Sequence, residues 1–147
     1  MQAVRTTYRY WTAILFLAVL VQIGAAGYGA FNAADKADPG PLSDKQFTSG
    51  FDFHNGFGYI IFLGTVVLLL LALGARLGKR RVLMTLGAPL LLIVQILLAW
   101  GGEGQAVVGI FHPLNAFLIA AFTGRLAYES WWGTRRPAAA RVPVETP

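Results

Sequence analysis

The chain has 147 residues, of which 56% are hydrophobic and only 13% are charged, and it contains no cysteine. A soluble domain of this size needs more charged side chains to cover its surface. The lack of cysteine excludes disulfides, thiolate metal sites and iron–sulfur clusters. The formal charge of +5 comes from basic residues beside long apolar runs. Membrane topology explains such a distribution better than nucleic-acid binding, so we expect a protein of the lipid bilayer that binds no nucleic acid.

Four apolar runs predict four membrane-spanning helices, because each is close to the ~20 residues that cross a bilayer core. The runs are Tyr10 to Phe31, Phe53 to Ala75, Val82 to Trp100, and a fourth within Val107 to Trp132. We expect an all-α integral membrane four-helix bundle over residues 10–132. A short segment (1–9) precedes it, and a disordered tail (133–147) follows. Gly27 and Gly29 are expected to lie where the first helix ends.

The first run also has features of a cleaved signal peptide. Arg5 and Arg9 precede it, and the small residues Ala26, Gly27 and Ala30 lie near its end. The run is nevertheless longer than the 7–15 residues typical of a signal peptide's apolar region. We therefore expect the first helix to be retained.

The basic residues predict the orientation of the helices. Nine of the 12 fall on one side of the predicted membrane, whereas Lys36 and Lys45 fall on the other side and Arg125 lies within the fourth run. The nine are Arg5, Arg9, Arg76, Lys79, Arg80, Arg81, Arg135, Arg136 and Arg141. Because basic residues mark the cytoplasmic side, we expect a multi-pass protein of the cytoplasmic (inner) membrane with both termini inside the cell.

The chain reads as a tandem duplication of a helix pair. Val21-Gln22-Ile23 in the first run matches Val94-Gln95-Ile96 in the third. Phe53-His54 opens the second run as Phe111-His112 opens the fourth, and the match continues at an offset of 58 residues. Copies with two helices each insert in the same direction and are related by an axis along the membrane normal. This symmetry predicts that His54 and His112, the only histidines, lie at the same depth. Because each precedes the far end of its helix by about 20 residues, we expect both near the outer face.

Two histidines on facing helices can supply both axial ligands of one haem. Gly58 and Ala116 follow them by four residues and therefore lie on the same helix faces. Small residues there leave room for a flat macrocycle. We expect His54 and His112 to bind the iron of a b-type haem, with Gly58 and Ala116 beside it.

Other interpretations of the pair remain open. Each histidine can be a polar residue at the membrane interface, and Pro113 favours His112 as a helix N-cap because proline prefers the first helical position. The pair can also bind zinc or copper if Asp52 or Glu103 completes the site.

The motifs Phe53-His54 with Gly58, and His112-Pro113-Leu114-Asn115, resemble those of small four-helix membrane proteins of actinobacteria. The pattern is also similar to one half of haem A synthase, over about residues 8–132. The resemblance implies haem ligation by His54 and His112. The synthase has a second half, which this chain can match only as a homodimer. Many synthases have a cysteine pair, and the synthase has a glutamate where Phe51 stands here, so we do not carry over its oxidation of a haem methyl group.

The sequence therefore predicts one-electron transfer, with a quinol or a redox protein as partner, and leaves open whether the protein is an enzyme. The alternative is a structural or accessory membrane subunit without haem. Transport is a third class, supported only by the repeat.

Overall fold

The computed structural model describes residues 1–37 and 40–133. The described residues form six α-helices and no strand. The helices are α1 (Gln2–Ala37), α2 (Asp44–Ser49), α3 (Asp52–Gly74), α4 (Lys79–Gly104), α5 (Ala106–Gly109) and α6 (Phe111–Trp131). Apart from Gly133, the predicted tail lies outside the described residues.

Four helical segments are long and apolar enough to cross a membrane, namely α1, α3, α4 and the stretch Ala106–Trp131 formed by α5 and α6. This confirms the expected all-α fold with four candidate spans. Between 11% and 28% of the most apolar stretch of each segment is buried inside the bundle. Most of the apolar surface therefore faces outward, where lipid tails rather than water are the favourable surroundings.

Helices α1 and α4 extend beyond the predicted apolar runs. Helix α1 begins at Gln2 and continues through Gly27 and Gly29 to Ala37, so the expectation that these glycines lie at its end is wrong. A glycine inside a helix costs only about 1 kcal/mol relative to alanine, which neighbouring contacts can offset. One such contact lies at Gly29, where an added Cβ would stand 2.6 Å from Cε1 of the Phe51 ring.

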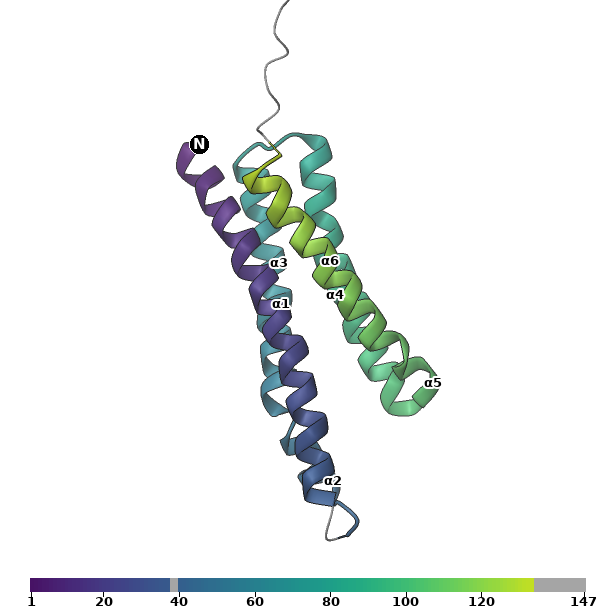
Figure 1. Ribbon diagram of the computed structural model, residues 1–147. Helices are drawn as coiled ribbons and strands as arrows, with labels where there is room; N and C mark the ends of the chain where they lie inside the picture. Colours follow the sequence, from purple (N-terminus) through teal and green to yellow (C-terminus); the bar gives the residue numbers. More distant parts are fainter. Residues whose placement is uncertain (38–39, 134–147) are drawn as a thin grey trace, which may run out of the picture.

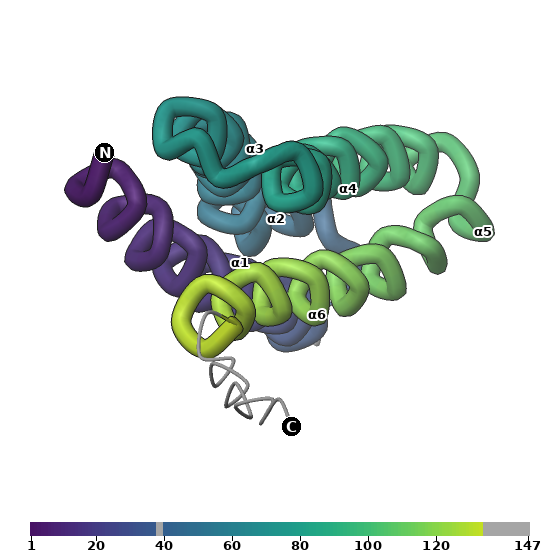
Figure 2. The backbone as a smooth tube through the Cα atoms, turned by 90° about the horizontal axis from the view of Figure 1, so that it is seen from above, coloured from purple at the N-terminus to yellow at the C-terminus, as the bar shows by residue number. Residues whose placement is uncertain are grey.

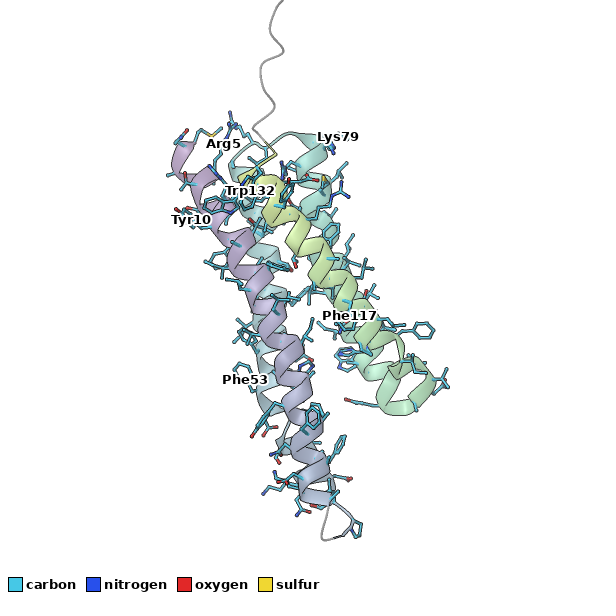
Figure 3. The ribbon with its side chains drawn as sticks, in the orientation of Figure 1. Arg5, Tyr10, Phe53, Lys79, Phe117 and Trp132 are labelled. Carbon is cyan, nitrogen blue, oxygen red and sulfur yellow. The ribbon has the colours of Figure 1, made fainter. Side chains whose placement is uncertain are left out.

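The four long helices form a ring in which each packs against two neighbours. Helices α1 and α4 each contact both α3 and α6, so α1 lies diagonally opposite α4, and α3 lies opposite α6 (Figure 2). Figure 1 shows the α1–α3 pair diverging from the α4–α6 pair toward the end that carries α2 and α5. We call this the open end. The other end, the closed end, holds the N-terminus, the α3–α4 turn and the last turn of α6, as Arg5, Lys79 and Trp132 indicate in Figure 3.

The buried side chains form one inward face on each long helix. Those in α1 are Tyr8, Thr12, Leu15, Val19, Gly29 and Ala33, and those in α4 are Thr85, Ala88, Pro89 and Leu92. Those in α3 are Ile61, Gly64, Thr65, Leu68 and Ala72, and those in α6 are Ile119, Thr123, Leu126, Ala127 and Ser130. Apart from Gly29 and Ala33, these residues lie in the middle of the bundle and at its closed end, so the core holds the helices together there.

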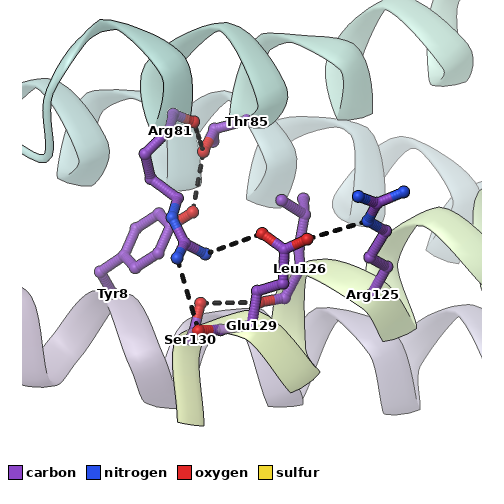
Figure 4. A network of polar contacts seen from close by, with 7 residues as sticks. All are labelled: Tyr8, Arg81, Thr85, Arg125, Leu126, Glu129 and Ser130. Atoms are coloured by element: carbon purple, nitrogen blue, oxygen red, sulfur yellow. Dashed lines mark hydrogen bonds and ion pairs between the residues drawn. The ribbon is translucent and has the colours of Figure 1, made fainter. Parts of the chain in front are cut away.

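Polar contacts tie the closed end together (Figure 4). The Tyr8 hydroxyl lies 2.8 Å from Thr85 Oγ1 and joins the diagonal helices α1 and α4. Glu129 receives a hydrogen bond from Arg125 Nε at 2.9 Å and pairs with Arg81 at 3.7 Å. With this end fixed, the helix pairs are free to diverge toward the other end, where both histidines lie.

Candidate functional site

The two histidines face each other across the bundle from diagonal helices. His54 lies in the first turn of α3 and His112 in the first turn of α6. Their ring centroids are 6.2 Å apart, and the ring planes are inclined by 65°. Both side chains are half-buried. The structure thus brings together two residues that are far apart in the sequence.

Each imidazole is oriented by a backbone carbonyl of a neighbouring helix. His54 Nδ1 lies 3.1 Å from the Gln22 carbonyl oxygen in α1, and His112 Nδ1 lies 3.1 Å from the Gln95 carbonyl oxygen in α4. A carbonyl oxygen only accepts hydrogen bonds, so Nδ1 of each ring is the donor. The remaining nitrogen, Nε2, then keeps its lone pair for a ligand.

The glutamine side chains add cross-links around the histidines. Gln22 Nε2 donates to the His54 carbonyl oxygen at 2.7 Å. In the other half, Asn115 Nδ2 donates to Gln95 Oε1 at 2.8 Å and to the Leu91 carbonyl oxygen at 3.1 Å. These bonds fix the helix backbones that supply the carbonyl acceptors, so they support the orientation of both rings. Nothing in the sequence indicates that backbone carbonyls orient the imidazole rings.

A cavity of about 350 Å³ lies between the two helix pairs and is lined by both histidines. Its size falls within the range of ligand pockets, roughly 300–1,000 Å³. Gly58 and Ala116, the predicted neighbours of the histidines, also line it. Gly58 has a second role, because a Cβ there would stand 2.9 Å from Gln22 Nε2. Glycine thus leaves room for the Gln22 amide beside the His54 turn.

Two alternative interpretations of the histidines do not agree with the geometry. Helix α6 begins at Phe111 after the cap residue Ile110, so the N-cap interpretation of His112 is wrong. Pro113 still lies in the first turn, where its missing N–H breaks no helical hydrogen bond. Within residues 1–37 and 40–133, no three His, Cys, Asp or Glu side chains are grouped to hold a metal ion. Asp52 and Glu103 therefore do not complete a three-ligand zinc or copper site with the histidines.

Comparison of the chain with protein-family models, with curated proteins and with solved structures finds no match.

Proposed function

We propose that the protein binds one b-type haem with His54 and His112 as its two axial ligands and transfers single electrons. The separation of the two imidazoles is the observation that carries this proposal. With a metal–nitrogen bond of about 2.0 Å and about 1.2 Å from nitrogen to ring centroid, two imidazoles bound on opposite sides of one metal ion would have centroids about 6.4 Å apart. The distance here is 6.2 Å. A direct hydrogen bond between the rings would bring the centroids closer, to about 5.3 Å.

The surroundings of each ring support ligation. Ligating histidines usually donate their second ring N–H to a carboxylate or a backbone carbonyl, which fixes the tautomer and raises the basicity of the ligating nitrogen. Both histidines have such a carbonyl at 3.1 Å from Nδ1. A polar residue that only marks the membrane interface has no need for this arrangement.

The residues around the cavity suit a flat apolar group. The walls between the helix pairs are mainly apolar, with Val19, Ile23, Leu92 and Ile96 among them. Bound haem supplies one-electron chemistry, and the protein would tune its potential through the two imidazoles, their hydrogen bonds and burial. The resemblance to one half of haem A synthase implies only the ligand role of His54 and His112. A quinol or a redox protein is the proposed partner.

The burial pattern supports the tandem repeat that underlies the proposal. Four of the five buried positions in α3 recur in α6 at the predicted offset of 58 residues, and three of the six in α1 recur in α4 at an offset of 73. The pairs are Ile61 with Ile119, Thr65 with Thr123, Leu68 with Leu126, Ala72 with Ser130, Thr12 with Thr85, Leu15 with Ala88, and Val19 with Leu92. A duplicated helix pair accounts for two histidines at one level.

The proposed topology has both termini in the cytoplasm and the histidines near the outer face of the inner membrane. Arg5 and Lys79 share the closed end with Trp132 (Figure 3), and the charge asymmetry between the loops favours this end as the cytoplasmic one.

Absorption spectroscopy tests the haem proposal directly. Oxidised and dithionite-reduced spectra would be recorded for the detergent-purified protein, with haemin added during purification, and for His54→Ala and His112→Ala. Phe53→Ala and Phe111→Ala are matched controls, because each phenylalanine precedes a histidine and is exposed. Phe53 is 60% exposed and Phe111 is 54% exposed.

We expect sharp reduced α and Soret bands in the wild type and in both controls, and their loss or broadening in both histidine variants. A wild type that stays colourless with haemin refutes the proposal and leaves a structural or accessory membrane subunit. Bands that survive both histidine substitutions refute the assignment of the ligands.

A further inference from the structure

A shallow groove lies at the closed end, between α4 and α6. It is remote in position from the histidines, which lie toward the open end. Its lining residues are Lys79, Arg80, Leu83, Met84 and Gly87 from α4, and Phe122 from α6.

The lining changes from charged to apolar along α4. Lys79 and Arg80 begin the helix, and Leu83, Met84 and Gly87 follow on later turns. At 1.5 Å per residue, Lys79 and Gly87 are about 12 Å apart along the helix axis. A Cβ at Gly87 would lie 2.6 Å from Cζ of Phe122, so glycine lets the aromatic ring lie against α4 and close the apolar part of the groove.

Neither Lys79 nor Arg80 forms a direct ion pair in the part of the chain that the structure describes, although Arg80 lies within electrostatic reach of Glu129. Glu129 is the acidic residue of the closed end there, and it pairs with Arg125 at 2.9 Å and Arg81 at 3.7 Å. Membrane topology accounts for basic residues in this turn. It does not account for an apolar groove between two helices that continues from Lys79 and Arg80 into the membrane region.

We propose that this groove binds an anionic phospholipid of the surrounding membrane. Lys79 and Arg80 bind the phosphate of the headgroup, and an acyl chain lies along Leu83, Met84 and Phe122. Charge complementarity selects the headgroup, because basic pockets between transmembrane helices are suited to anionic lipids. The apolar part of the groove selects a lipid over a free phosphate ion.

Native mass spectrometry of the detergent-purified full chain tests this site. Phosphatidylglycerol, phosphatidylcholine and inorganic phosphate would be titrated separately into the wild type and into Lys79→Gln/Arg80→Gln. The matched control is Arg5→Gln/Arg76→Gln, which removes the same charge at the same end but outside the groove. The two single variants at Lys79 and Arg80 replace the double variant if it is not monodisperse.

Each basic side chain near a membrane surface strengthens anionic-lipid binding by roughly fivefold, so the double variant should lose about 25-fold in affinity for phosphatidylglycerol. The control should lose less than about threefold, since the remaining field is screened beyond a Debye length. Equal binding of phosphatidylglycerol and phosphatidylcholine overturns the proposal, as does an equal loss in the control. Inorganic phosphate binding as tightly as the lipid overturns the lipid as occupant.

Discussion

The hydrogen bond between Tyr8 and Thr85 should respond unequally to the removal of its two partners. The Tyr8 hydroxyl lies 2.8 Å from Thr85 Oγ1, and the two residues are 2% and 0% exposed. Thr85 Oγ1 also donates to the Arg81 carbonyl oxygen at 2.9 Å. Because that oxygen can only accept, the Thr85 proton is used there, and Tyr8 is the donor of the shared bond.

The loss of unfolding free energy in each variant depends on whether the remaining hydroxyl group still has a hydrogen-bond partner. Tyr8→Phe removes the donor and leaves the Thr85 hydroxyl bonded to Arg81, so it should cost about 0.5–1 kcal/mol of unfolding free energy, close to the average of ~0.6 kcal/mol for hydrogen bonds between membrane helices. Thr85→Val removes the acceptor and leaves the Tyr8 hydroxyl buried without a partner, which costs about 1–3 kcal/mol. The double variant should be more stable than Thr85→Val alone, because it removes the unpaired hydroxyl.

Reversible unfolding in mixed detergent–SDS micelles, followed by tryptophan fluorescence, measures these differences. The two single variants and the double variant form a complete double-mutant cycle. A loss for Tyr8→Phe equal to or larger than that for Thr85→Val contradicts the assigned donor and acceptor. Additive losses in the double variant contradict the contact itself.

Three further predictions concern the site and the closed end. Gly58→Val should lower the haem-to-protein ratio, because the added side chain would occupy the cavity beside His54 and its Cβ would stand 2.9 Å from Gln22 Nε2. An unchanged pyridine haemochrome absorbance would contradict this prediction. Glu129→Gln should cost about 1–2 kcal/mol in the SDS titration, whereas Arg125→Gln, with a side chain that is 64% exposed, should change stability by less than about 0.5 kcal/mol. Equal losses of stability in Glu129→Gln and Arg125→Gln would contradict the larger contribution expected of Glu129. Asn115→Leu removes a donor to two acceptors on α4 and should cost about 1–2 kcal/mol in the same titration; a more stable variant refutes it.

Residue type and spacing predict the four long helices and the approach of the two histidines. An uncharged run reports the length that crosses the lipid, so the spans were recognisable. It does not indicate where a helix ends in water, so the extension of α1 to Ala37 could not be predicted from it. The short helix α2 has a sequence signal, since Ser43 and Gln46 form a capping box. The helix was not predicted because the segment was interpreted as a charged loop.

The orientation of the imidazoles could not be predicted, because their partners are backbone carbonyls. Gln22 and Gln95 are recognisable in the sequence only because their side chains are polar and the helices around them are apolar. Their carbonyls accept from the histidines only because α1 packs beside α3 and α4 beside α6. Packing geometry, rather than residue type, creates this part of the site.

The two halves of the site reach the same imidazole contact with different supporting side chains. Asn115 donates to Gln95 Oε1, whereas the matching position at the offset of 58 residues is Phe57, which cannot donate. Gln22 instead donates to the His54 carbonyl oxygen, and its Oε1 is buried without a partner within the described residues. Nevertheless, Nδ1 of each ring lies 3.1 Å from its carbonyl. The same Nδ1–carbonyl contact over unlike supports agrees with the proposed ligand role, because coordination depends on the nitrogen that faces the metal and not on how the neighbouring helix is held.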